Sequence, residues 1–286
     1  MKNIHNNSII TVLWIIAIWG CKTETCFISP QGYDLTAPEI IQLPHALDEV
    51  SGICFLKGNN DSLYAIQDES GKLYKYVLSS KALIKNKFYN KGDYEDISIN
   101  QNGQFVVLKS NGELVTFAKT DTWMENIEQV TVIKDLLPSG EYEGIFAKDN
   151  KWYVLCKNCK GEDDKKELTI YEIQPANGNK AAVVLPIKVK FSTLRKEANA
   201  KKENFHPSCL SFNSVTKEWF VISAVNNKLM VLDTQWHAKF LFELNPSVFK
   251  QPEGIAFNDQ GDLFVSNEAA GGTANLLRIN YRAPVK

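Results

Sequence analysis

The sequence has no excess of either charge: 32 lysine and arginine residues stand against 33 aspartate and glutamate residues, a net charge of −1. A nucleic-acid-binding protein needs a basic surface that displaces counterions from phosphates, so this balance argues against a nucleic-acid partner. The GxSxG, HExxH and glycine-rich phosphate-loop motifs are also absent. Nothing in the sequence therefore identifies an enzyme.

Long apolar runs are absent except for one near the N-terminus, from Ile9 to Trp19, which follows Lys2 and contains only Thr11 as a polar residue. This run is long enough for the core of a signal peptide and too short to span a bilayer in the mature protein. We therefore predict that residues 1–20 are a signal peptide.

The run ends at Gly20-Cys21, which resembles the lipobox of bacterial lipoproteins, where the cysteine is acylated and becomes the first mature residue. Each buried CH₂ of the acyl chains would add about 0.8 kcal/mol of membrane affinity. We expect lipidation at Cys21, a tether over residues 21–37, and a membrane-anchored lipoprotein of the bacterial cell envelope that faces the periplasm. Because Trp19 is bulky for a lipobox, ordinary cleavage and an uncleaved anchor stay open.

Cysteine is scarce beyond Cys21, and only Cys156 and Cys159 have a suggestive spacing. A zinc site would need a second pair or nearby histidines, which the sequence does not provide. A redox CxxC motif usually begins a helix, whereas this one follows the strand-like segment Lys151–Leu155. The pattern predicts a turn that either closes a disulfide or leaves both thiols free.

Five segments of the chain share one pattern, in which a polar residue precedes a Gly-Ile-like pair and an apolar strand. Their third positions are Ser51, Glu95, Glu143, Ser208 and Glu253, spaced by 44, 48, 65 and 45 residues. A repeat of 40 to 50 residues is typical of propeller blades. Each segment is followed by a polar turn and two further β-branched and aromatic runs, which predicts three antiparallel strands in each unit.

We therefore predict an all-β fold, a five-bladed β-propeller over residues 38–286. The last unit stops at its third strand, so the strand at 39–43 is expected to supply its fourth and to close the ring without an open edge. Six blades are the alternative, with a degenerate blade at 181–191. The polar stretch 193–203 has the composition of a short surface helix.

The segments 47–53 (LDEVSGI) and 63–74 (LYAIQDESGKLY), together with YEDI, YEGI and PEGI and the later GDLFVSNE at 261–268, resemble the SdiA-regulated family. The resemblance covers nearly the whole chain after about Leu35. It implies a five-bladed propeller of the bacterial envelope with a calcium site and a distant similarity to NHL-repeat propellers. Cys156-Lys157-Asn158 and Ala224-Val225-Asn226 depart from the acidic residues that this family tends to place at the ends of second strands.

In a propeller, the start of the first strand and the end of the second share one face of the disc, and equivalent residues of all blades converge on the axis. The candidate metal ligands on this face are Glu49, Ser51, Asp93, Glu95, Glu141, Glu143, His206, Glu253 and Glu268. Asp68 and Glu69, at the end of a second strand, are expected on the same face.

So many carboxylates around one axis repel one another, which calls for a compensating cation, for raised pKa values, or for lysines such as Lys109 and Lys157. Calcium accepts six to eight oxygen ligands in flexible geometry and is the cofactor we expect. A structural alternative is that these residues bond to the backbone of the next blade and hold the blades in register. A catalytic acid–base pair is the third alternative.

The sequence thus favours a non-catalytic, calcium-binding envelope lipoprotein that presents one face to a small ligand or to another envelope protein. The alternative is a metal-dependent hydrolase of phosphoesters or lactones acting in the axial funnel, an analogy from fold.

Overall fold

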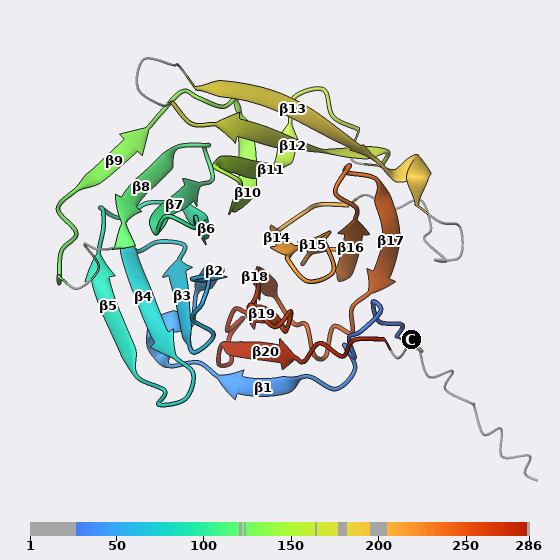
Figure 1. The fold of residues 1–286 in the computed structure, drawn as a ribbon, viewed down its shortest axis with the longest axis horizontal. Coiled ribbons are helices and arrows are strands. Elements are labelled where there is room, and N and C mark those ends of the chain that lie inside the picture. The colour runs from blue at the N-terminus through green and yellow to red at the C-terminus, as the bar shows by residue number, and fades with distance from the viewer. Residues whose placement is uncertain are drawn as a thin grey trace, which may run out of the picture.

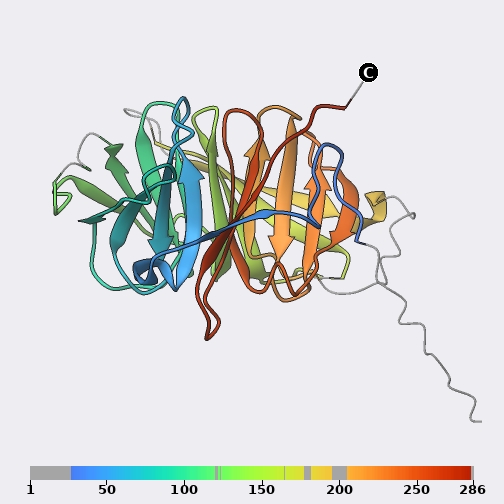
Figure 2. The same cartoon turned by 90° about the horizontal axis from the view of Figure 1, so that it is seen from below.

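The structure is a computed structural model that describes residues 27–119, 122, 124–163, 165–176, 182–194 and 205–284. Within these residues the strands form five four-stranded antiparallel sheets arranged radially around one axis (Figure 1). Seen from the side, the sheets form a disc and their strands cross its thickness (Figure 2). The chain is a five-bladed β-propeller, as the sequence predicts.

In four blades the strands follow one another outward from the axis in chain order, and the fifth blade does the same except that its outermost strand is β1. The first blade contains β2 (Val50–Phe55), β3 (Ser62–Gln67), β4 (Lys72–Val77) and β5 (Leu83–Lys87), and the second β6 (Tyr94–Ile99), β7 (Gln104–Lys109), β8 (Leu114–Ala118) and β9 (Val130–Ile133). The third contains β10 (Gly140–Lys148), β11 (Lys151–Cys159), β12 (Glu167–Gln174) and β13 (Val183–Lys190). The fourth contains β14 (Cys209–Asn213), β15 (Glu218–Ser223), β16 (Lys228–Leu232) and β17 (Ala238–Glu243), and the fifth β18 (Pro252–Phe257), β19 (Leu263–Asn267), β20 (Asn275–Ile279) and β1 (Glu39–Gln42).

The blades are held together by apolar side chains that fill the space between neighbouring sheets. The second strands are almost wholly buried, because both of their faces pack against adjacent blades. Aromatic residues dominate some of these layers: Trp219 stacks on Trp236 with ring centroids 4.4 Å apart, and Tyr153 meets Trp219 edge-on at 5.0 Å. The β-branched and aromatic runs of the sequence therefore become the walls of the disc.

The outer strand of the fifth blade comes from the other end of the chain. In β1, Glu39 to Gln42 pair antiparallel with Arg278 to Asn275 of β20 (Figure 1). Just after β1, the backbone N–H of Leu43 donates to the carbonyl of Ala274 at 3.0 Å, and the Leu43 side chain is buried.

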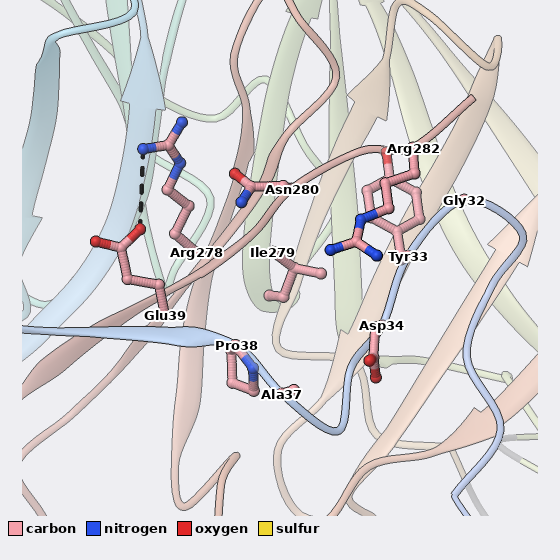
Figure 3. Close-up of a pocket in the computed structure, with 10 residues that line it drawn as sticks. All are labelled: Gly32, Tyr33, Asp34, Ala37, Pro38, Glu39, Arg278, Ile279, Asn280 and Arg282. Atoms are coloured by element: carbon pink, nitrogen blue, oxygen red, sulfur yellow. Dashed lines mark ion pairs between the residues drawn. The ribbon is translucent and has the colours of Figure 1, made fainter.

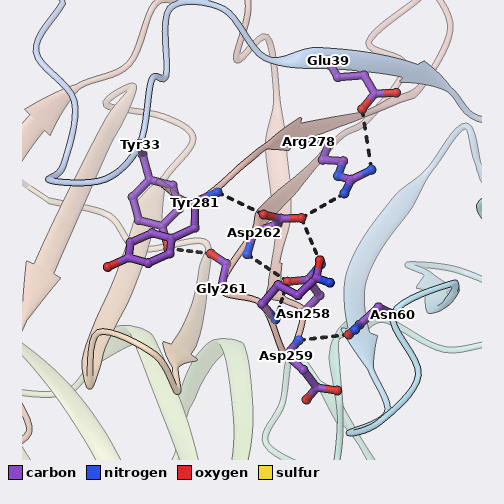
Figure 4. A network of polar contacts seen from close by, with 10 residues as sticks. Tyr33, Glu39, Asn60, Asn258, Asp259, Gly261, Asp262, Arg278 and Tyr281 are labelled. Carbon is purple, nitrogen blue, oxygen red and sulfur yellow. Dashed lines mark hydrogen bonds and ion pairs between the residues drawn. The ribbon is translucent and has the colours of Figure 1, made fainter. Parts of the chain in front are cut away.

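A polar network holds β20 and the N-terminal segment to the fifth blade (Figure 4). The Asp262 carboxylate accepts hydrogen bonds from the Arg278 guanidinium at 2.9 Å and from the backbone N–H of Tyr281 at 3.0 Å. The Tyr33 hydroxyl donates to the Gly261 carbonyl at 2.7 Å. These contacts fix the N-terminal segment from residue 33 onward.

Part of the segment that the sequence assigned to a tether belongs to the fold. Tyr33 and Leu35 are only 8% and 3% exposed and pack against the core between the fourth and fifth blades. The physical reason is that these two apolar side chains cover the end of that core, so the propeller begins before residue 38.

The alternative of six blades, with a degenerate blade at 181–191, is wrong. Residues 183–190 form β13, which pairs along its full length with β12 as the outer strand of the third blade. The long spacing between the third and fourth repeats therefore reflects longer strands and connections within one blade. The expected helix at 193–203 lies largely outside the described residues, and Phe191–Thr193 form a short 3₁₀ turn.

The signal peptide at 1–20 and the lipidation site Cys21 also lie outside the described residues. Within the part of the chain that the structure describes, no helix is long and apolar enough to cross a membrane.

Candidate functional site

Neighbouring first strands approach one another closely around the axis, where β2, β6, β10, β14 and β18 form an inner ring (Figure 1). The position after the repeat register is glycine in three of the five segments, because a side chain would not fit there. A Cβ atom on Gly52 would lie 2.6 Å from the Ile97 nitrogen, and one on Gly254 would lie 2.8 Å from the Ser51 carbonyl oxygen. Glycine at this position of the repeat thus allows the inner strands to pack closely.

In the second blade this position is Asp96, which is buried and links two blades. Its carboxylate accepts hydrogen bonds from the N–H of Ile97 and from the N–H of Ile145 in the third blade, both at 2.8 Å. Burial raises the pKa of Asp96 well above its usual range, while the two backbone donors act to lower it. Two positions on, the Ser98 hydroxyl accepts from the N–H of Ala147 at 2.9 Å. In this pair of blades, register locking is performed by Asp96 and Ser98, not by Glu95.

Glu95, Glu143 and Glu253, called here the axial carboxylates, come from three different blades and interact around one lysine. The Lys157 Nζ, at the end of β11, lies 2.7 Å from Glu143 Oε1. The charge of Glu143 raises the pKa values of Glu95 and Glu253, and the charge of Lys157 lowers them. The structure therefore brings together the three glutamates that share the repeat register.

The axial carboxylates are hard to ionise together. Burial is the main cause that raises the pKa of Glu95 to about 8, and repulsion from Glu143 and Asp93 adds to it. Burial, followed by repulsion from Glu143 and Glu268, raises the pKa of Glu253 to about 7. Burial also raises the pKa of Glu143, although its hydrogen bond to Lys157 opposes the shift. Burial acts to lower the pKa of Lys157, but the surrounding carboxylates outweigh it and raise that pKa, so the lysine stays charged.

A second, more exposed set of acids surrounds the axial carboxylates. The pKa of Asp68 is raised by burial and by repulsion from Glu69 and Asp93. The pKa of Glu268 is raised by burial and by repulsion from Asp68 and Glu49. Acids from the ends of second strands therefore lie near acids from the starts of first strands, and we call this set of carboxylates the acidic face.

The remaining predicted residues have other roles or stand further out. Glu141 is exposed, and its backbone pairs with Asn158. Ser51 is buried at the contact with Gly254. The Ser208 hydroxyl accepts from the N–H of Ala224 at 3.1 Å, and the N–H of His206 donates to the Asn226 side chain at 2.9 Å. At Ser208 the hydrogen bond is made within its own blade.

The acidic face offers oxygen donors, but its carboxylates do not form a closed cage. Among the described residues, the group of three metal-ligating side chains whose donor atoms all lie within 4.8 Å is Cys156, Cys159 and Glu162. A cation among the axial carboxylates would thus depend on waters as well as on Glu95, Glu143 and Glu253. The donor chemistry suits calcium, and the 36% exposed side chain of Lys157 has solvent to move into. Lys109, the other expected counter-ion, instead pairs with Glu113 at 2.7 Å.

Two cavities lie away from these carboxylates. A small one of about 70 Å³ lies within the disc and is lined by later residues of the first strands, among them Cys54, Asp96 and Ser211. A groove of about 560 Å³ lies at the outer edge of the fifth blade, between the N-terminal segment and the end of β20 (Figure 3). Arg278 and Arg282 line it with Asp34 and Glu39, and Arg278 is already paired with Asp262. The larger cavity therefore does not contain the axial carboxylates.

Sequence reasoning missed two residues of this region. Asp96 stands out as the one acid where other repeats have glycine or cysteine, and this irregularity was the available signal. Glu162 lies three positions after Cys159, and nothing in the repeat predicts its side-chain direction. The structure also decides the state of the CxxC motif, because Cys156 and Cys159 form a disulfide. The predicted turn is wrong at these positions, since both cysteines pair with β10 as part of β11 and the chain turns only after Cys159.

Comparison with known proteins supports the architecture. The model of the SdiA-regulated family matches residues 28–270. A luciferin-regenerating enzyme is similar in structure, with a TM-score of 0.52, 11% identity, and 86% of this chain and 96% of that chain covered. A protein of unknown function from Bacteroides thetaiotaomicron has a TM-score of 0.51 and 14% identity, with 80% of this chain and 58% of that chain covered. At such identities these likenesses concern the fold alone. No curated protein matches the chain.

Proposed function

Because the chain belongs to the SdiA-regulated family, we propose that it is a non-catalytic binding protein of the bacterial cell envelope whose acidic face takes a calcium ion and presents it to a ligand or partner. The observation that carries this proposal is the convergence of Glu95, Glu143 and Glu253 from three blades. Two of these glutamates have pKa values near neutrality, about 8 and about 7. Carboxyl groups with such pKa values give up their protons readily when a metal ion binds.

Calcium matches this arrangement better than the other common divalent cations. The candidate donors are carboxylate and hydroxyl oxygens, which calcium accepts in irregular geometry with waters completing the shell. Magnesium demands stricter octahedral geometry, and zinc prefers nitrogen and sulfur donors. When calcium binds, Lys157 leaves Glu143 for solvent, so the lysine and the cation compete for one carboxylate.

The test is calorimetric titration of chelator-treated protein with calcium at pH 6 and pH 8.5. We expect tighter binding at pH 8.5 and release of protons at the lower pH, because the metal takes carboxylates that otherwise hold protons. Glu253→Gln should weaken binding at both values. Glu128→Gln, at an exposed position beside β9, is the matched control and should change nothing. Absence of calcium binding at pH 8.5 would contradict the proposal.

We extend the proposal to the location of the protein. The apolar run 9–19 followed by Gly20-Cys21 supports a lipoprotein anchored through Cys21. Labelling of cells with a fatty-acid probe should mark the wild-type protein and leave Cys21→Ala unmarked. Equal labelling of both proteins would end the claim. We also propose that β1 closes the propeller by covering the edge of β20 that would otherwise be open.

A second candidate function is supported by the interaction of Glu95 with Glu143. A carboxyl group with a pKa of about 8 beside a carboxylate paired with lysine is a possible acid and base for hydrolysis. A panel of phosphomonoesters and lactones assayed with calcium separates this function from simple binding. Turnover that disappears in Glu95→Gln would replace the binding proposal.

A further inference from the structure

The end of β11 carries a second cluster of ligating groups, distinct from the acidic face. The Sγ atoms of Cys156 and Cys159 and a carboxylate oxygen of Glu162 all lie within 4.8 Å of one another. Both cysteines are buried, at 1% and 8% exposure, and Glu162 is half-buried. The turn that joins them is fixed by a hydrogen bond from the N–H of Glu162 to the Cys159 carbonyl at 3.2 Å.

The Glu162 carboxylate is held in place by its own supporting contacts. The hydroxyl of Thr169, a residue of β12 that is 1% exposed, donates to Glu162 Oε2 at 2.9 Å. Lys188 of β13 in turn donates to that hydroxyl at 2.8 Å. A ligand oriented by a buried hydroxyl and a further charged group has the outer-shell support that metal sites in proteins require.

We propose that the dithiol form of this cluster is a zinc site, in which Cys156, Cys159 and Glu162 supply three ligands and a water supplies the fourth. The Glu162 carboxylate takes the place of the second cysteine pair or histidine that the sequence lacks. The spacing of two residues between the cysteines is that of zinc-binding turns, and zinc accepts thiolate and carboxylate ligands in tetrahedral geometry. Bonds of about 2.3 Å from zinc to sulfur place the two sulfurs about 3.8 Å apart. The three groups already share one space, so the change needed is a local separation of the two sulfurs at the irregular end of β11.

The disulfide keeps this site closed, and a dithiol reductant opens it. Two electrons and two protons from the dithiol convert the Cys156–Cys159 bond into two thiols, and the reductant becomes a disulfide. Zinc then displaces both thiol protons and binds the two thiolates and the Glu162 carboxylate. The site is therefore a redox-gated metal site, since the oxidised protein lacks its sulfur ligands.

The test compares reduced and oxidised full-length protein, titrated with Zn²⁺ against a chromophoric chelator and separately with Co²⁺. We expect one zinc per reduced chain, an affinity at least about 100-fold weaker after oxidation, and a thiolate-to-cobalt charge-transfer band in the reduced form only. Glu162→Gln should weaken zinc binding about 10- to 100-fold while the sulfur band remains. This variant keeps both cysteines, and its amide oxygen can still accept the hydrogen bond from the Thr169 hydroxyl.

The matched control is Glu172→Gln, which alters another carboxylate of the same blade that pairs with Lys151 at 2.6 Å and lies outside the cluster. It should bind zinc like the wild type. Equal zinc binding by oxidised protein, no thiolate band on reduction, or equal affinity of Glu162→Gln and wild type would each overturn the proposal. Calcium binding at the acidic face is read from a different titration, so the two proposals fail separately.

Discussion

The third and fifth blades begin with the same motif, Glu-Gly-Ile, yet the two glutamates have different partners. Glu143 meets Lys157, which lies between the two disulfide-bonded cysteines at the end of β11. Glu253 meets instead the amide of Gln251 and the repulsive charge of Glu268 at the end of β19. The inner strand fixes where each carboxylate stands, and the returning strand adds a cation, Lys157, in one blade and an anion, Glu268, in the other.

The outer edges of these two blades differ as well. In the third blade β13 follows β12 along the chain, whereas the fifth blade receives β1 from the N-terminal end. One blade is thus completed locally and the other by a distant segment. The comparison predicts that the two blades respond differently to the same kind of change.

The largest effect is expected from removing β1, the strand that the fifth blade receives from the N-terminal segment. Deletion of residues 38–44 removes the ladder with β20 and the buried side chain of Leu43. Loss of a buried leucine costs about 2–5 kcal/mol, and each backbone group left unpaired and buried adds about 1–3 kcal/mol. We expect thermal unfolding to lose cooperativity or to shift down by on the order of 10 °C. Ile40→Ala, at a position 56% exposed in the same strand, should have little effect. An unchanged melting temperature in the deletion variant would show that β1 is dispensable.

A smaller effect is expected where the glutamate partners differ. Lys157→Met leaves Glu143, which is 8% exposed, without its cation, at a cost of about 3 kcal/mol at pH 8 in chelator, the lower end of the range for a buried pair because Lys157 is partly exposed. The cost should shrink as the pH is lowered to 5, because burial raises the pKa of Glu143 and loss of Lys157 removes the contact that opposes this shift, so that Glu143 takes up a proton more readily. In the fifth blade, Glu268→Gln removes a repulsive charge and should leave stability unchanged or raised. Thermal unfolding of both variants at pH 8 and pH 5 checks this difference. Equal losses of stability in Lys157→Met and Glu268→Gln would contradict it.

The smallest effect is a pH slope shared by the second and fifth blades. Folded-state pKa values of about 8 for Glu95 and about 7 for Glu253 lie above the ordinary 4.5, so the folded protein holds more protons than the unfolded chain between these values. The stability of metal-free protein must therefore fall as pH rises from 4.5 through 8, by on the order of 1–3 kcal/mol after solvent screening. Glu95→Gln and Glu253→Gln should flatten the slope and melt higher than wild type at pH 8.5, and excess calcium should abolish the difference. A slope that is unchanged in both variants would refute this origin.

The fold was predictable because its signal is repeated five times. Strand-and-turn chemistry at a regular spacing specifies blades, and the shared register brings Glu95, Glu143 and Glu253 together. Tyr33 and Leu35 were not predictable as core residues, because they lie outside the repeat and are buried only by contact with the distant fourth and fifth blades.

The candidate site was predictable in position but not in detail. That Lys157 pairs with Glu143 while Lys109 pairs with Glu113 depends on the exact course of two strand ends that look equivalent in sequence. Glu162 belongs to a turn, and its direction is set by Thr169 on the next strand. Contacts made between neighbouring strands carry no periodic signal of their own.

The pairing of β1 with β20 also bears on how the protein is made. Tyr33 and its hydrogen-bond partner Gly261 are 228 positions apart, so these N-terminal contacts wait for almost the whole chain to be synthesised. Closing so long a loop costs entropy before the contacts form, which makes this step a slow one in folding. Until β1 pairs with it, the outer edge of β20 is unpaired. A chain truncated before β20 leaves β1 without a partner. Incomplete chains thus expose a sheet edge to proteases and to other chains, while a finished chain hides it.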